Sequence, residues 1–64
     1  MKPECKLTEQ DGNIYNLISI AKRTLKNNGM EQEAEELVNR IIVNNEAKSY
    51  SHALSIIMEY VEVI

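Results

Sequence analysis

The spacing of apolar residues along the chain predicts three short helices. In the first, the apolar side chains are Ile14, Leu17, Ile18, Ala21 and Leu25. This i, i+3, i+4, i+7 spacing places them on one face of an α-helix. Similar spacing recurs at positions 34, 37, 38, 41 and 42, and again at positions 50, 53, 54, 57, 58 and 61. We therefore predict an all-α fold, in which a compact three-helix domain (residues 11–64) follows an extended N-terminal arm (residues 1–10).

Residues at the ends of these segments are typical of helix caps. Asp11-Gly12-Asn13 predicts a turn into the first helix, because Asp and Asn side chains accept hydrogen bonds from free backbone N–H groups. Gly29 suits the left-handed position that ends this helix, and Met30 can supply the apolar contact of such a cap. The other predicted boundaries are Asn44-Asn45 at the end of the second helix and Ser49 as the N-cap of the third.

The C-terminal residues allow two interpretations. Residues 61–64 alternate and are rich in β-branched side chains, so they either fray or pair with the N-terminal arm as a short strand. Ile56 and Ile64 lie outside the apolar face predicted for the third helix. Unexplained apolar residues on a short terminal helix are typical of a subunit contact. We therefore expect a homo-oligomer.

Composition supports self-association. A chain of 64 residues buries only about 60% of the surface that it exposes when unfolded, so its stability margin is thin. One cysteine excludes an internal disulfide, and one histidine disfavours a structural zinc site. Because the chain has no Trp or Phe, we expect an aliphatic core with the three tyrosines as its only large rings.

Charge and hydropathy indicate where the protein acts and what it can bind. The N-terminal residues lack the apolar run of a signal peptide, and no segment approaches the roughly 18 apolar residues that span a bilayer, so we expect a cytoplasmic protein with no membrane partner. The formal net charge of −3 disfavours general nucleic-acid binding. The charges are also segregated, with basic Lys22, Arg23 and Lys26 followed by acidic Glu31, Glu33, Glu35 and Glu36.

Few residues suit catalysis. Cys5 has no histidine near it in sequence, and His52 is expected at the cap of the third helix. Gly12 and Gly29 are explained by turns, so there is no glycine-rich phosphate loop. The glutamates gather at a helix start rather than in an apolar pocket. We expect a non-enzymatic protein with no metal and no cofactor.

The first helix offers a possible binding site. Its three cations can bind phosphate while Tyr15 stacks on a base, although a solvated basic face explains the same cations. The candidate binding residues are Asn13, Tyr15, Lys22, Arg23, Lys26 and Tyr60. A DNA-binding regulator is less favoured, because the third helix carries Glu59 and Glu62 where a recognition helix needs basic or amide side chains.

Several short motifs carry a resemblance to a known group of proteins. They are Lys6-Leu7, Asp11-Gly12-Asn13, Tyr15, Arg23-Thr24-Leu25-Lys26, Ser49-Tyr50, Ala53-Leu54 and Met58-Glu59-Tyr60-Val61. On these motifs, which span about residues 6–62, the chain resembles small helical proteins of bacteriophages and prophages. It departs from that group at Glu9, where glycine is common, and near Ser51-His52, where an acidic residue is common.

The resemblance implies a mobile-element setting, in which a small protein without catalytic residues acts by binding inside the host cell. In the first hypothesis, the protein docks on a host defence or regulatory protein and blocks it, with its glutamate face imitating nucleic-acid phosphates. In the second, a homo-oligomer sequesters a phosphate-bearing signal nucleotide with the cations and tyrosines near the first helix. A DNA-binding regulator and a structural accessory of a phage assembly are the further alternatives.

Overall fold

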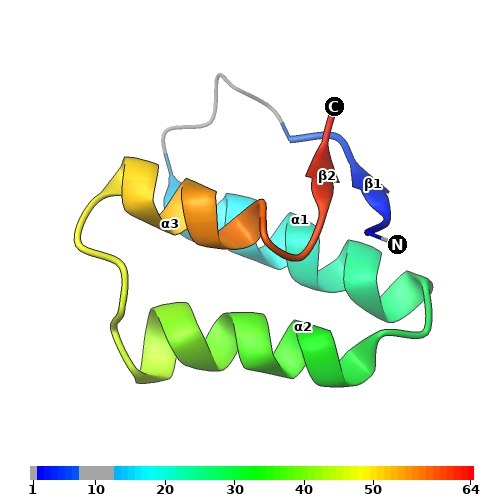
Figure 1. Cartoon of the computed structure of the whole chain (residues 1–64), viewed down its shortest axis with the longest axis horizontal. Coiled ribbons are helices and arrows are strands. Elements are labelled where there is room, and N and C mark those ends of the chain that lie inside the picture. Colours follow the sequence, from blue (N-terminus) through cyan, green and yellow to red (C-terminus); the bar gives the residue numbers. More distant parts are fainter. Residues whose placement is uncertain (1, 8–12) are drawn as a thin grey trace.

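The computed structural model describes residues 2–7 and 13–64 as helices joined to two very short strands (Figure 1). In chain order the elements are β1 (Glu4–Cys5), α1 (Ile14–Asn27), α2 (Glu31–Val38), the π-helical segment η1 (Asn39–Val43), α3 (Tyr50–Ile57) and β2 (Glu62–Val63). Because η1 directly continues α2, the predicted three-helix fold is confirmed, with a two-stranded parallel sheet added to it. No helix in the described residues is long and apolar enough to cross a membrane.

α1 has a cap at each end. At its start, the Asn13 side chain accepts a hydrogen bond from the Tyr15 N–H at 3.0 Å, which satisfies one of the free helix donors. At its end, Gly29 has a φ of 73°, and the Met30 N–H donates to the Leu25 carbonyl at 2.9 Å. These are features of a Schellman motif. The predicted glycine cap is confirmed.

The second helix changes its hydrogen-bond spacing partway along. In η1 the Asn44 N–H reaches the Asn39 carbonyl at 2.7 Å, five positions back. The run of β-branched residues here crowds the preceding turn of an α-helix, which favours a local departure from it. The wider turn rotates the residues that follow, so Ile41 is buried whereas Ile42 is 44% exposed. The prediction that Ile42 lies on the buried face is therefore wrong.

α3 begins with a reciprocal cap. The Ser49 hydroxyl oxygen accepts from the His52 N–H at 3.1 Å, and His52 Nδ1 accepts from the Lys48 N–H at 3.2 Å. As in a capping box, two backbone donors are satisfied by two side chains. The predicted roles of Ser49 as N-cap and His52 as a cap residue are confirmed.

The buried face of α3 differs from the predicted one. Ile56 is only 2% exposed, so its prediction as a subunit-contact residue is wrong; Ile64 is 62% exposed. Tyr50 and Met58, which were expected on the buried face, are 40% and 50% exposed. The helix ends at Ile57 and the chain turns at residues 58–60, which removes Met58 from the helix face and leaves both isoleucines of the last turn in the core.

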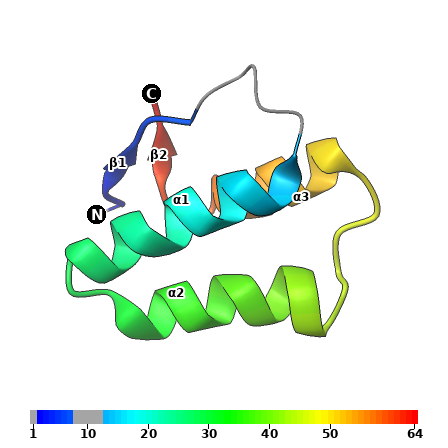
Figure 2. The ribbon, with the colours of Figure 1, turned by 180° about the vertical axis from the view of Figure 1, so that it is seen from behind.

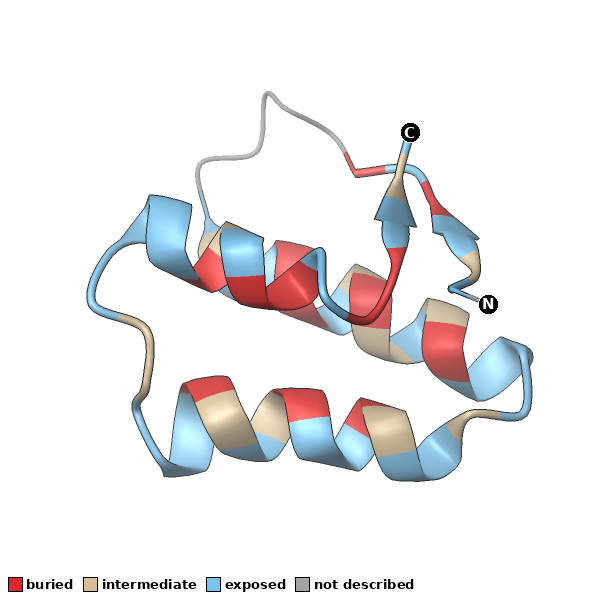
Figure 3. Cartoon of the chain, viewed as in Figure 1, coloured by how far each residue is buried: buried red, intermediate tan, exposed pale blue. Residues whose placement is uncertain are grey.

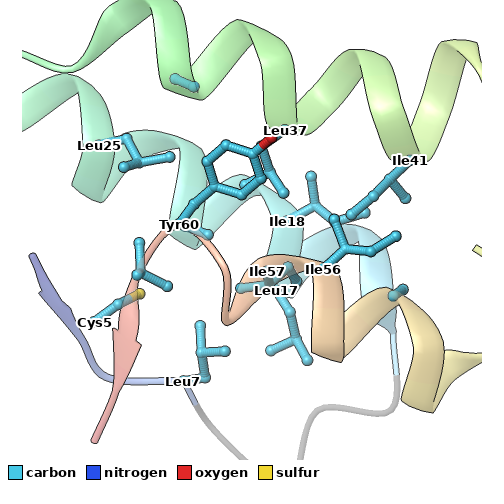
Figure 4. Close-up of a cluster of buried hydrophobic side chains, with 14 residues drawn as sticks. Cys5, Leu7, Leu17, Ile18, Leu25, Leu37, Ile41, Ile56, Ile57 and Tyr60 are labelled. Carbon is cyan, nitrogen blue, oxygen red and sulfur yellow. The ribbon is translucent and has the colours of Figure 1, made fainter. Parts of the chain in front are cut away.

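One apolar core joins the helices to the strands (Figures 3 and 4). Its largest fully buried side chains include Leu17, Leu25, Leu37, Ile56, Ile57 and Val61. Tyr60 is the only tyrosine among the buried residues, since Tyr15 and Tyr50 lie at the surface. The predicted aliphatic core is confirmed, but a single ring contributes to it.

β1 and β2 bring the two ends of the described chain together (Figure 1). The parallel register places Cys5 opposite Val63, so of the two interpretations of the C-terminal residues, pairing with the arm is the one observed. Cys5 is 2% exposed, and its sulfur accepts a hydrogen bond from the Thr24 hydroxyl at 3.4 Å, so the thiol belongs to the core. The predicted Asp11-Gly12 turn and the predicted boundary between arm and domain lie outside the described residues.

α1 is the central helix of the fold. It packs against both α2 and α3, whereas α2 and α3 make little direct contact with each other (Figures 1 and 2). Polar and charged residues occupy the side of α1 that faces away from the core. This exposed face positions the candidate site.

Candidate binding site

The exposed face of α1 carries a shallow basic hollow. Its volume is about 300 Å³, and it is lined by Ser19, Lys22, Arg23 and Lys26. The three cations are three, four and seven positions beyond Ser19, so all four residues share one helix face. The three cations lie in the second half of α1, and Lys26 lies in its last turn, where the helix dipole favours a cation. We call this site the cationic hollow.

The cations of this hollow have no carboxylate partner within residues 2–7 and 13–64. Both ion pairs of that part of the chain involve Arg40 instead. Lys26 lies four positions after Lys22 and three after Arg23, and like charges at these spacings destabilise a helix by about 0.2–0.5 kcal/mol per pair. An anion held among the three side chains would relieve this repulsion. The cationic hollow can therefore bind phosphate or a similar oxyanion.

A second hollow lies between the start of α1, the segment after η1 and the start of α3. Its volume is about 400 Å³. Its lining is mostly apolar and includes two tyrosines. The apolar and aromatic residues that line it are Ile14, Tyr15, Ile41, Ala47, Tyr50 and Ala53. Lys48 and Asn45 add polar groups. Because Tyr15 is 63% exposed and Tyr50 is 40% exposed, much of each tyrosine is accessible. We call this site the aromatic hollow.

The aromatic hollow is preformed by the fold around it. Ile41 and Ala53 belong to the core, with 7% and 2% of their surfaces exposed, so they make a fixed floor. Asn45 adopts a left-handed φ of 54°, which asparagine tolerates better than most residues, and this turn directs the chain from η1 toward α3. The Ser49 cap then fixes the start of α3. The floor and one wall of the hollow are thus held in place by the fold.

The predicted site residues are only partly brought together. The three basic ones share the cationic hollow, while Tyr15 lines the aromatic hollow on the same helix. Asn13 uses its side chain to cap α1. Tyr60 lies apart: its ring is in the core, 9% exposed, and it lines neither hollow (Figure 4).

Tyr60 belongs to a polar network that ties the second helix to the turn after α3. Its hydroxyl donates to Glu36 Oε1 and accepts from Arg40 Nη1 at 3.3 Å. Arg40 also pairs with Glu46 at 3.1 Å and with Glu59 at 3.0 Å. The guanidinium carbon lies 5.8 Å from the centroid of the Tyr60 ring, within cation–π range. The network links parts of the chain that otherwise touch little.

The pKa values of three groups in this network are shifted. The hydrogen bond to Glu59 is the main cause that raises the pKa of the Arg40 guanidinium, and the same bond lowers the pKa of the Glu59 carboxyl. Burial raises the pKa of the Tyr60 hydroxyl, and its hydrogen bond to Glu36 raises it further. At neutral pH Arg40 and Glu59 are therefore charged, whereas the Tyr60 hydroxyl is neutral and donates.

The spacing of apolar residues gives a weak signal that Tyr60 is buried, but the sequence gives no signal that Arg40 contacts it. Ala53, Ile56 and Tyr60 follow the i, i+3, i+7 spacing of a buried helix face, although α3 ends before Tyr60. Arg40 lies 19 positions from Glu59 and 20 from Tyr60. Contacts at such separations depend on how the helices pack, which local spacing does not encode.

The other reactive side chains of the described residues have structural roles. Cys5 is buried, and His52 Nδ1 is engaged in the α3 cap. No three His, Cys, Asp or Glu side chains of the described residues gather in a way that could hold a metal ion. None of the glutamates of α2 forms an ion pair with described residues, although Glu36 accepts the hydrogen bond from the Tyr60 hydroxyl. No protein-family model, curated protein or solved structure matches the chain.

Proposed function

We propose that the protein is a non-enzymatic binding protein that sequesters a small phosphate-bearing ligand on α1. The observation that carries this proposal is the cationic hollow. In a chain of net charge −3, it holds three cations on one helix face with no carboxylate partner among the described residues. Arg and Lys form charge-assisted hydrogen bonds to phosphate, and Arg can bind two of its oxygens at once.

The fold itself gains little from this arrangement. The helix dipole favours cations near the end of α1, but the like-charge pairs around Lys26 oppose that gain. A bound phosphate would be attracted by all three cations and could accept a further hydrogen bond from the Ser19 hydroxyl. Retention of the ligand needs no reaction, so the protein acts by lowering the free ligand concentration.

The resemblance to phage and prophage proteins supplies the setting for this proposal. In an infected host cell, a ligand worth sequestering is a nucleotide that signals defence. We extend the proposal to a homo-oligomer, since the exposed apolar side chains of Ile42, Val43 and Ile64 offer surfaces for self-association. The solution mass tests this extension, because a strict monomer in the presence and absence of ligand would contradict it.

Docking on a host defence or regulatory protein is the second candidate. The exposed glutamates Glu31 and Glu35 favour it, because they form no ion pair with described residues and lie one helical turn apart. Such carboxylates can imitate the phosphates of a nucleic acid for a basic partner. A DNA-binding regulator has less support, since the exposed residues of α3, which are Tyr50, Ser51, His52 and Ser55, include no lysine or arginine.

Titration calorimetry with inorganic pyrophosphate tests the proposed function. We expect the wild-type protein to bind and the double variant Lys22→Glu/Lys26→Glu not to bind, because the attraction in the cationic hollow is reversed. Lys6→Glu is the matched control, since Lys6 is exposed but lies outside both hollows. Equal binding by wild type and the double variant would overturn the proposal.

An infection assay separates the two candidates. If protection of the phage is lost in Glu31→Lys/Glu35→Lys and kept in Lys22→Glu/Lys26→Glu, blocking of a host protein is the better account. The opposite pattern supports sequestration. Far-ultraviolet circular dichroism on all variants establishes that each one is folded.

A further inference from the structure

We infer that the aromatic hollow is the ring-binding half of the same site, so that the sequestered ligand is a small nucleotide carrying two or more phosphates. This inference rests on the proposed function, because the cationic hollow must hold the phosphates. It adds Tyr50, Lys48 and the apolar floor to the site, and it assigns each hollow one part of the ligand.

The two hollows share one helix. Tyr15 lines the aromatic hollow and Lys22 lines the cationic hollow, seven positions further along α1. Seven residues complete nearly two turns, so both side chains leave the same side of the helix, with their backbones about 10 Å apart. Helical side chains lean toward the N-terminus, which brings the long lysine side chain back toward Tyr15. A single ligand can thus reach both hollows.

The lining of the aromatic hollow suits a flat ring that carries polar edges. The tyrosines offer π faces for stacking, while Ile14, Ile41 and Ala53 provide an apolar surface below. Lys48 and Asn45 supply a cation and an amide for edge or sugar oxygens. A volume of about 400 Å³ falls within the range of small-molecule sites and leaves room for a base with its sugar.

The separation of the hollows selects the class of ligand. Inorganic phosphate can occupy the cationic hollow only, and a nucleoside can occupy the aromatic hollow only. A ligand that fills both hollows therefore needs a chain that joins its ring to an outer phosphate, as in a nucleoside triphosphate or a short run of phosphodiester-linked nucleotides. These two sources share the ring and the phosphates, and the experiment distinguishes them.

Titration calorimetry with three probes tests the inference: inorganic triphosphate, adenosine triphosphate and a single-stranded trinucleotide. We expect one nucleotide probe to bind at least tenfold more tightly than inorganic triphosphate, because stacking adds to the phosphate contacts. Tyr15→Leu keeps side-chain bulk but removes the ring, and it should reduce the affinity for that nucleotide about tenfold while leaving inorganic triphosphate unchanged. Met58→Leu is the matched control, because Met58 is also exposed but lines neither hollow.

The outcomes separate this inference from the proposed function. If all three probes bind equally and Tyr15→Leu changes none of them, the inference is overturned and the cationic hollow alone remains as an anion site. If no probe binds, both are overturned. A nucleotide whose extra affinity is lost in Tyr15→Leu supports the inference, and whether this is the triphosphate or the trinucleotide identifies the source. Should Tyr15→Leu unfold, Lys48→Gln gives the same test from the other side of the hollow.

Discussion

The two ends of α3 meet the rest of the chain in different ways. At its end near the strands, the ring of Tyr60 is buried in the core, and Arg40 links the second helix to Glu59 and to the Tyr60 hydroxyl. At the opposite end, the chain from η1 to α3 leaves the aromatic hollow open, with Tyr15 and Tyr50 at its edge. One end is a packed and hydrogen-bonded junction. The other is an accessible site.

The difference shows what decides the role of a tyrosine in so small a protein. Tyr60 has a carboxylate and a guanidinium as hydrogen-bond partners, so its ring can be buried without leaving its hydroxyl unsatisfied. Tyr15 lies at the surface of α1 and keeps most of its area exposed, so its ring is not part of the core. The closed end should therefore govern stability, and the open end should govern binding.

Removal of the Tyr60 ring should have the largest effect on stability. Tyr60→Ala leaves a cavity between the helices, and we expect a loss of about 3 kcal/mol in the free energy of unfolding, as for other buried aromatic residues. Urea denaturation followed by circular dichroism measures it. A loss below about 1 kcal/mol would show that the space collapses around the cavity, and the contrast between the two ends would disappear.

Removal of the Tyr60 hydroxyl alone should cost less. Tyr60→Phe loses the bonds to Glu36 and Arg40, and we expect a loss of about 1.5 kcal/mol, since hydrogen bonds to charged groups are stronger than neutral ones. Because the pKa of Tyr60 is higher in the folded than in the unfolded state, its contribution is complete below the unfolded value near 10 and is lost as the pH rises through the folded value. Alkaline destabilisation should therefore be weaker in Tyr60→Phe, and denaturation at pH 8 and pH 11 compares the two proteins.

The cap of α3, at the open end, should contribute less to the free energy of unfolding than the Tyr60 side chain does. Ser49→Ala removes the acceptor of the His52 N–H, and we expect a loss of about 1 kcal/mol. Ser55→Ala is the matched control, because the Ser55 hydroxyl only donates to the Ser51 carbonyl within the helix. Equal losses in the two variants would show that the capping bond contributes nothing specific.

The smallest effect on stability is expected for Tyr15. Because Tyr15 is 63% exposed, Tyr15→Ala should change the free energy of unfolding by no more than about 0.5 kcal/mol. The same denaturation experiment, run beside Tyr60→Ala, measures the contrast directly. A loss close to that of Tyr60→Ala would mean that the aromatic hollow is part of the structural core rather than a binding site.

Local sequence patterns predicted the helices well because their causes are local. The face of α1 and the caps at Gly29 and Ser49 depend on residues no more than a few positions apart. The errors arose where tertiary packing intervenes. Ile42 does not lie on the predicted buried face, because the helix is wider in η1. Ile56 is buried, because the chain turns soon after it.

The candidate site could be predicted only in part. The basic residues are close in sequence, so their grouping on α1 was visible in the spacing of Lys22, Arg23 and Lys26. The aromatic hollow was not visible, since it combines Tyr15 with Tyr50, which lie on different helices. Its existence depends on the path of the chain between η1 and α3.

The pairing of β1 with β2 has a consequence for the order of folding. The helix turns form through contacts close in sequence, whereas the strands join residues at opposite ends of the described chain, which carries a larger entropic cost of closure. We expect this sheet to form last and to open first under mild denaturant. Cys5 belongs to β1 and is buried, so the rate at which its thiol reacts with an alkylating reagent should report these openings before the helices unfold.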